Sequence, residues 1–321
     1  MAEERKTIYL CLAHMSEEGI EQKYVKEAFD TNWVVPMGPN VNAFEQDLSD
    51  FANTNSDGSK LNHKVVCLSA GTAAVHLALI ACDVKQGDEV CVQSFTFCAS
   101  SHPITYLGAK PVFIDSERET WNMDPELLEK AIIDRKEKSG QYPKAIIPVA
   151  LYGMPYDCEK IMAIANKYDI PVIEDAAEGM GSRFNGQVLG TFGRFGVLSF
   201  NGNKMITTSG GGALICRNDE DANNVMWHAT QARDAYPYYQ HTEIGYNYRM
   251  SNVCAGIGRG QMTVLDAHIA HHQHVQALYE ELLKDVPEVH IHKQPADSRY
   301  DANFWLCAAT IDKDVKIQGQ E

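Results

Sequence analysis

One lysine of this chain stands in a stretch whose composition favours covalent chemistry. Lys204 lies within SFNGNKMITTSGGGALI, residues 199–215, and three consecutive glycines follow it. A lysine enclosed in a pocket can act as a free amine that attacks a carbonyl carbon to give a Schiff base. The glycines would let the backbone approach a bulky ring closely. The alternative is a solvated lysine in a turn, which is the commoner state of this residue type.

Two further features stand where a strand is expected to end. SAGTAA, residues 69–74, follows a strand-like run and opens a helical pattern, so Gly71, Thr72 and the free N–H groups of the helix can bind a phosphate. Its alternative is a capped helix that binds only water. Asp175 ends the run VIED, where a buried carboxylate needs a cationic partner such as a protonated pyridine nitrogen. Its alternative is the N-cap of a following helix.

These three features complement one another chemically. A phosphate cradle, a strand-end carboxylate and a lysine amine are the groups that pyridoxal 5'-phosphate requires. We therefore expect this cofactor, with Lys204 and Asp175 as the catalytic residues.

The elements that must position these residues alternate between strands and helices. Asp124 is a plausible N-cap, with Pro125 at the first helical position. The alternation predicts an α/β fold, in which helices flank a mostly parallel sheet and the carboxyl ends of the strands carry the chemistry. The strand-like runs are residues 65–68, 89–93, 111–115, 145–152 and 171–175, and the helical patterns are 71–82, a segment from about residue 96, 124–133 and 158–168.

The second half of the chain has a different pattern. Short β-like pieces separated by glycines follow residue 181, and the chain looks helical from about residue 251. VHIHKQP and NFWLCAATI then favour strands of a smaller domain. We expect a large domain over residues 1–246 and a smaller, incomplete α+β C-terminal domain over residues 247–321.

Composition excludes several classes of partner. A formal net charge of −15 argues against binding to nucleic acid or anionic membranes. No run approaches the about 18 apolar residues of a membrane span, and MAEERKTIYL lacks the features of a signal peptide. The nine cysteines contain no CxxC pair, which favours reduced thiols and a cytoplasmic location. His268, His271 and His272 have helical spacing, but a solvated helix face is favoured over a metal site, so no metal is expected.

Several segments together resemble the DegT/DnrJ/EryC1/StrS sugar aminotransferases, a family of fold-type-I pyridoxal-phosphate enzymes. The stretch FNGNKMITTSGGGAL is most similar to the branch that aminates nucleotide-linked 4-keto-6-deoxy sugars, of the perosamine and bacillosamine type. The matching segments lie in the same order between about residues 8 and 311: SAGTAAVHLAL, SFTFCAS, PVFID, IEDAAEGMGS, LGTFGRFGVLSFNGNKMITTSGGGAL and GYNYRMSN.

The resemblance implies a role for each matching residue. Lys204 would bond to the cofactor and move the proton, and Asp175 would pair with the pyridinium nitrogen. Asn247 would reach the phosphate of the neighbouring subunit's cofactor, which implies a homodimer with shared active sites. The other expected contacts are Gly71, Thr72 and Ser199 with the phosphate, Phe97 stacked on the ring, Glu178 near the phenolic oxygen, and His14 and Arg249 as substrate candidates.

The activity implied by the resemblance is transfer of an amino group from glutamate to carbon 4 of a nucleotide-linked keto sugar, such as a UDP-linked sugar, for surface polysaccharide or glycan synthesis. Amination at carbon 3 is an alternative, because the motifs are shared. A non-catalytic regulatory protein with this fold is another. Related sugar dehydratases replace the lysine with histidine, so Lys204 argues against them.

Overall fold

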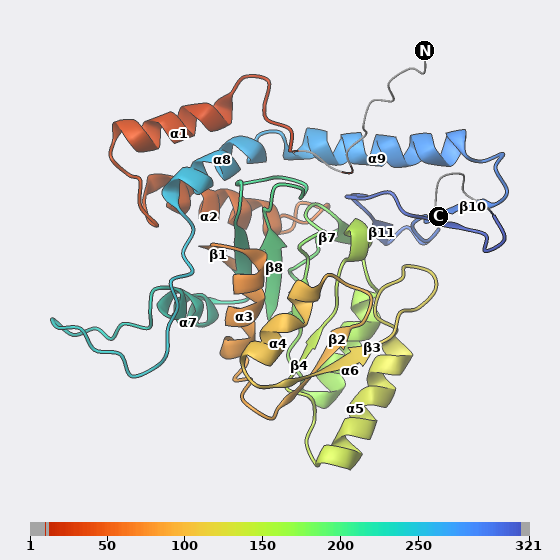
Figure 1. Ribbon diagram of the computed structural model, residues 1–321, viewed down its shortest axis with the longest axis horizontal. Coiled ribbons are helices and arrows are strands. Elements are labelled where there is room, and N and C mark those ends of the chain that lie inside the picture. The colour runs from red at the N-terminus through yellow and green to blue at the C-terminus, as the bar shows by residue number, and fades with distance from the viewer. Residues whose placement is uncertain (1–9, 11–12, 316–321) are drawn as a thin grey trace.

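The computed structural model of the chain describes residue 10 and residues 13–315 (Figure 1). Two expectations, that the N-terminal residues form no signal peptide and that the C-terminal domain is incomplete, concern residues outside this part. The helices are α1 (Ile20–Asp30), α2 (Pro39–Ala52), α3 (Gly71–Ala81), α4 (His102–Tyr106), α5 (Pro125–Ser139), α6 (Cys158–Tyr168), α7 (Asp219–Ala229), α8 (Asn252–Met262) and α9 (Leu265–Leu282). The strands are β1 (Lys64–Leu68), β2 (Glu89–Gln93), β3 (Lys110–Ile114), β4 (Ala145–Ile147), β5 (Ile173–Asp175), β6 (Arg183–Phe184), β7 (Gln187–Val188), β8 (Phe195–Ser199), β9 (Gly212–Cys216), β10 (Val289–Ile291), β11 (Tyr300–Asp301) and β12 (Ala309–Ile311).

The central sheet has the strand order β3-β2-β4-β5-β8-β9-β1. Its two halves meet where parallel bridges join Ile146 to Val172 and Val149 to Asp175. Strand β9 runs antiparallel to both of its neighbours, and the other pairings in this sheet are parallel. The mostly parallel sheet expected from the sequence is therefore confirmed, and the carboxyl ends of β1, β2, β4, β5 and β8 lie at one edge.

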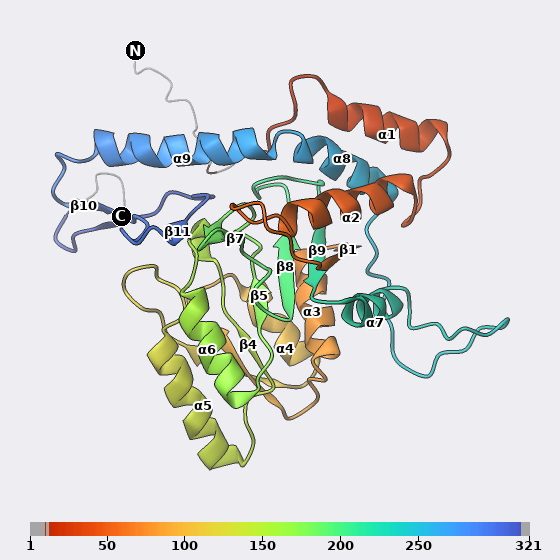
Figure 2. The same ribbon diagram turned by 180° about the vertical axis from the view of Figure 1, so that it is seen from behind.

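Alternate residues of the central strands enter two different hydrophobic cores. In β1, Val65 and Cys67 pack on one face and Val66 and Leu68 on the other, as the period of two in a strand requires. The first face is covered by α2, α5 and α6, and the second by α3, α4 and α7 (Figure 2). Burial on both faces explains why these strands read as continuous apolar runs.

Most expected elements are confirmed, and three are wrong in extent: the helix from about residue 96, the strand over 145–152 and the strand over NFWLCAATI. The side chain of Asp124 caps α5 by accepting from the backbone N–H groups of Glu126 and Leu127. The helix expected from about Thr96 is only a 3₁₀ turn, Cys98–Ser100, followed by the five-residue α4. The strand expected over 145–152 ends at Ile147, because Pro148 has no N–H to continue the ladder.

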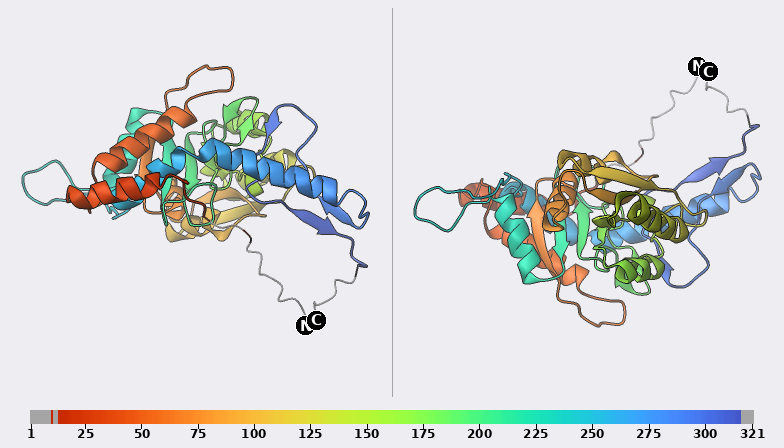
Figure 3. Two further views of the ribbon diagram at one scale, coloured as in Figure 1. Left: turned by 90° about the horizontal axis from the view of Figure 1, so that it is seen from above. Right: turned by 90° about the horizontal axis from the view of Figure 1, so that it is seen from below.

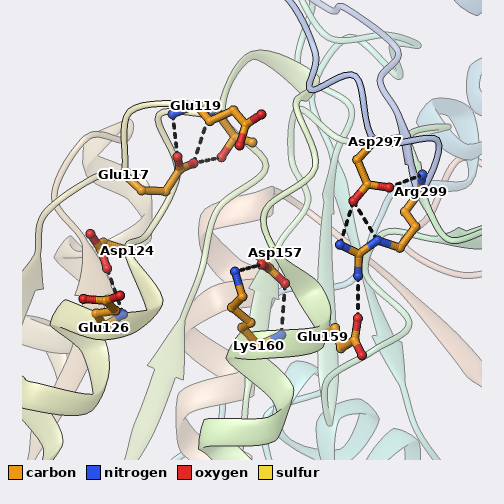
Figure 4. A network of polar contacts seen from close by, with 10 residues as sticks. Glu117, Glu119, Asp124, Glu126, Asp157, Glu159, Lys160, Asp297 and Arg299 are labelled. Carbon is orange, nitrogen blue, oxygen red and sulfur yellow. Dashed lines mark hydrogen bonds and ion pairs between the residues drawn. The ribbon is translucent and has the colours of Figure 1, made fainter.

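The C-terminal part lies across the carboxyl edge of the sheet. Helix α8 packs against α1 and α2, and α9 extends across the top of the molecule (Figure 3). Strand β11 pairs with β6, and Arg299 bridges Asp297 to Glu159 on α6 (Figure 4). The run NFWLCAATI forms a strand only at Ala309–Ile311, paired with β10. The expected domain boundary at residues 246 and 247 stays a prediction.

The described part of the chain bears on two expectations, the lack of a membrane-spanning segment and the reduced state of the cysteines. None of its helices is both long and apolar enough to cross a membrane. The eight cysteines described there are all free thiols. The cytoplasmic location stays a prediction.

Candidate active site

A cavity of about 340 Å³ opens at the carboxyl edge of the sheet. Its walls come from segments that follow β1, β2, β5 and β8, so residues far apart in the sequence meet there. The volume lies within the range usual for small-molecule sites. Among its lining residues are seven that the sequence singled out: Gly71, Thr72, Phe97, Asp175, Glu178, Ser199 and Lys204.

The N-terminus of α3 faces this cavity without a side-chain cap. Ala70 is the N-cap residue, and no side chain accepts from the first helical N–H groups. A Cβ on Gly71 would lie 3.1 Å from Cβ of Ser199, so the end of β8 stands directly against the start of the helix. The capped-helix alternative is therefore wrong. Free N–H groups, Thr72 and the Ser199 hydroxyl surround a place that suits a phosphate.

Asp175 is buried, with 6% of its surface exposed, yet it lines the cavity. The hydroxyl of Ser100 donates to its Oδ2 (2.6 Å), and the N–H of Ala177 donates to Oδ1 (3.2 Å). A carboxylate offers about four acceptor positions, so capacity remains for a further donor. No helix begins after β5 before α7, which makes the N-cap alternative wrong.

Lys204 lies in the loop between β8 and β9, and its side chain is only 13% exposed. Its Nζ lies 3.3 Å from Oε1 of Glu178 and 4.0 Å from the ring centroid of Trp305. The solvated-turn alternative is therefore wrong. The amine is largely enclosed and has both a carboxylate and an aromatic ring beside it.

Glu178 connects the lysine to the rest of the site. Its Oε2 accepts from the N–H of Tyr152 (2.7 Å) while Oε1 faces Lys204. Burial raises the pKa of Glu178 above the usual value, and the charge of nearby Asp175 adds to this shift; Lys204 and the Tyr152 N–H oppose it. The carboxyl group of Glu178 therefore takes up a proton more readily than a solvated glutamate does.

The glycine run, residues 210–212, brings the loop that carries Lys204 against the start of α3, the place that suits a phosphate. Ser199 and Gly212 are paired at the end of the β8–β9 hairpin. A Cβ on Gly212 would lie 2.5 Å from the carbonyl carbon of Ala70, beside the start of α3. A Cβ on Gly211 would lie 2.7 Å from the methyl carbon of Met250. At Gly212 the close neighbours are backbone atoms, so any larger residue would force the backbone to move; at Gly211 they are side-chain atoms, which can shift.

We expect Gly212→Ala to weaken cofactor binding at least about tenfold, because the added methyl group must displace the backbone at residues 70 and 71. Titration of the purified protein with pyridoxal 5'-phosphate, followed by absorbance, measures the affinity. Gly202→Ala is the matched control, since a Cβ at Gly202 of the same loop meets nothing within 4 Å. Equal affinities of the two variants would contradict this explanation of the glycine run.

Three predicted residues lie outside the main cavity. Asn247 is exposed and bridged to Thr230. Nη1 of Arg249 donates to Glu45 (2.7 Å) and to the carbonyl of Cys67 (2.8 Å), contacts that tie α2 to β1 and do not support a substrate role. The roles expected for Asn247 and Arg249 stay predictions.

His14 lies nearer to the lysine than its place in the sequence suggests. It shares a small cavity of about 20 Å³ with Lys204 and with the three histidines of α9. Within residue 10 and residues 13–315, no group of histidine, cysteine, aspartate and glutamate side chains has a geometry that would hold a metal ion. The substrate role expected for His14 stays a prediction.

Sequence reasoning missed Trp305, which lines the cavity from the C-terminal part of the chain. It stands in NFWLCAATI, which looked like an ordinary strand. Its indole N–H donates to the carbonyl of Asn203 (2.6 Å), the residue before the lysine. Only the fold brings these two positions together, because 102 residues separate them.

The groups in this cavity fit pyridoxal 5'-phosphate. The uncapped start of α3 suits the phosphate, and the spare acceptor capacity of Asp175 suits a protonated ring nitrogen. Phe97 is 70% exposed on the cavity wall and presents an aromatic face for stacking. Lys204 supplies the amine. These matches come from different strands, so packing within any single element does not explain all of them.

Comparisons with known proteins show the family of the chain. Residues 15–320 match the DegT/DnrJ/EryC1/StrS aminotransferase family. The putative pyridoxal phosphate-dependent aminotransferase EpsN of Bacillus subtilis (strain 168) is 44% identical over 96% of this chain and 76% of its own. A GDP-perosamine synthase of Escherichia coli O157:H7 is 36% identical over 93% of this chain and 77% of its own.

A solved structure shares the fold. The crystal structure of a DegT DnrJ EryC1 StrS aminotransferase from Brucella abortus superimposes with a TM-score of 0.84 and 27% identity, over 92% of this chain and 76% of that chain. The expected cofactor and fold class are thus confirmed. The chain belongs to the DegT/DnrJ/EryC1/StrS family and is a pyridoxal-phosphate-dependent sugar aminotransferase.

Proposed function

We propose that the chain transfers the amino group of glutamate to carbon 4 of a nucleotide-linked 4-keto-6-deoxy sugar. The observation that carries this proposal is the lysine loop. FNGNKMITTSGGGAL encloses Lys204 in the cavity, and it is this stretch that resembles the 4-aminating branch. The 36% identity to a GDP-perosamine synthase supports a nucleotide-linked sugar as the substrate.

Each residue of the cavity has a distinct part in this proposal. Lys204 holds the cofactor covalently and carries the proton between carbon atoms of the reacting system. Asp175 keeps the ring nitrogen protonated, and the start of α3 with Ser199 holds the phosphate. The cofactor would supply an electron sink. Glu178 receives a hydrogen bond from Tyr152 and orients the lysine amine.

We also propose a homodimer in which each subunit completes the other's site. Lys204 is the sole lysine or arginine among the described residues that line the cavity, although cofactor and sugar nucleotide both carry phosphates. The loop 233–244 projects far from the body of the subunit (Figures 1 and 2). Tyr239 is 80% exposed and Ile244 79% exposed on this loop, an apolar surface that suits a partner. Asn247 stands where the loop returns.

The position of amination is tested by the product. Incubation of the loaded enzyme with glutamate and either a 4-keto or a 3-keto sugar nucleotide, followed by NMR of the product, identifies the carbon that carries nitrogen. We expect turnover of the 4-keto sugar with the new amine at carbon 4. Product from the 3-keto sugar alone would replace this proposal with the carbon-3 alternative, which the same motifs allow.

A further inference from the structure

The ammonium of Lys204 is held between two side chains that belong to separate parts of the chain. Glu178 follows β5, and Trp305 comes from the segment between β11 and β12. Nζ is 3.3 Å from the carboxylate oxygen and 4.0 Å from the indole centroid, so the two contacts together define its place. A cation over an indole face is attracted by the ring quadrupole, and more strongly where water is excluded. Trp305 is 5% exposed.

Trp305 is held both by its indole ring and by its backbone. Its Nε1 donates to the carbonyl of Asn203 (2.6 Å), which anchors the backbone of the lysine loop. Its backbone N–H donates to Oδ1 of Asn303 (2.8 Å). A tryptophan that only filled a core would place no requirement on the residue next to the lysine. Here the same side chain holds the loop through its N–H and the amine through its ring.

Asn303 joins this arrangement to the other neighbour of the lysine. It is completely buried, and its Nδ2 donates to the carbonyls of Glu178 (2.9 Å) and Met180 (2.8 Å). The Asn303 side chain therefore hydrogen-bonds to the backbone of both Glu178 and Trp305, the two residues that flank the Lys204 ammonium. Gly153 leaves the necessary space, because a Cβ there would collide with Oδ1 of Asn303.

We propose that Trp305 is a positioning residue, which holds the free Lys204 side chain against Glu178 and keeps the lysine loop in place whenever the amine is not bonded to the cofactor. This inference rests on the proposed role of Lys204. Pyridoxal phosphate, when bound, would supply an aldehyde carbon. The Lys204 ammonium would first give one proton to the Glu178 carboxylate 3.3 Å away, and the freed amine nitrogen would then bond to that carbon with loss of one water. An amine already held at the cavity wall reaches that carbon more often than one that samples many rotamers.

The test uses the full chain stripped of cofactor and mixed with pyridoxal 5'-phosphate in a stopped-flow spectrophotometer. We expect Trp305→Leu to slow covalent capture about tenfold, since the leucine offers neither ring face nor N–H donor. Trp305→Phe keeps an aromatic ring but has no N–H donor, so its capture rate should lie between those of the wild type and Trp305→Leu. Hydrogen exchange of the amides in residues 200–211 should rise in both variants, because both lose the bond to Asn203.

Controls separate positioning from general packing. Trp121→Leu removes a tryptophan that stacks on His292, outside the cavity that holds Lys204, and should capture at the wild-type rate. A lower melting temperature of Trp305→Leu with an unchanged capture rate would mean packing alone and overturn the proposal. Should Trp305→Leu fail to fold, Trp305→Phe decides: capture and loop exchange both at wild-type values would overturn it equally.

The outcome for the lysine itself distinguishes this inference from the proposed function. Borohydride reduction followed by peptide mass analysis locates the captured lysine. Capture at Lys204 with no effect of Trp305→Leu removes the positioning role and leaves the proposed function standing. If the Lys204→Ala variant still bonded covalently to the cofactor, both the positioning role of Trp305 and the proposed function would be contradicted.

Discussion

Lys204→Ala is expected to reduce turnover by at least about 10³-fold, because the variant loses both the covalent attachment of the cofactor and the group that moves the proton. The amine cannot be replaced from nearby. Among the described lining residues of the cavity there is no second lysine, and the residues around Nζ are a carboxylate and an indole. The purified variant should also lose the near-ultraviolet to visible absorbance of the lysine-bound cofactor.

Two comparisons make this result specific. Lys160→Ala removes a surface lysine that pairs with Asp157 and should leave absorbance and turnover unchanged. Added methylamine should restore part of the turnover of Lys204→Ala, since a small amine can enter the space left by the side chain. A variant that keeps a tenth of wild-type turnover without added amine would exclude Lys204 as the reacting group.

The strands and helices that carry the site were predictable because their sequence patterns are local. VVCL, EVCVQ and CEKIMAIANKY form elements close to the expected bounds, since burial on both faces of the sheet and the helical period fix them. The parts that failed are those decided by neighbours in space. The segment after Thr96 was expected to be one helix, but it follows β2 along the cavity wall and forms only a 3₁₀ turn and the five-residue α4.

The meeting of the candidate site residues in one cavity was predictable for a related reason. Asp175, Ser199 and the start of α3 each end or follow a strand, and parallel strands bring their carboxyl ends to one edge. Periodicity located them, and the chemistry of the residue types named the cofactor.

Trp305 and Asn303 had no such signal. They lie in a segment without regular structure, and their partners are backbone carbonyls of residues 178, 180 and 203, positions about which a sequence pattern says nothing. The contact of the Arg249 guanidinium with Glu45, 204 residues away in the chain, likewise has no signal in the sequence.

Asp175→Asn is expected to lower turnover by roughly 10²–10³-fold while the fold remains intact. Asparagine has nearly the same shape and can still accept from Ser100, but it carries no charge. The site is buried, so a charge facing a protonated ring nitrogen is worth far more there than in water. Loss of that charge leaves the ring nitrogen unprotonated and weakens the electron sink that the reaction needs.

A graded series tests whether charge or hydrogen bonding at Asp175 matters. Ser100→Ala keeps the carboxylate and removes one 2.6 Å hydrogen bond, so turnover should fall only about three- to tenfold. Asp221→Asn is the matched control, because Asp221 is another buried aspartate, paired with Arg194 outside the cavity. Its loss should lower the melting temperature and leave the turnover of folded, loaded enzyme unchanged. If Ser100→Ala proved as damaging as Asp175→Asn, the orientation of this side chain, and not its charge, would be what the reaction requires. A charge requirement instead places the two variants at least tenfold apart.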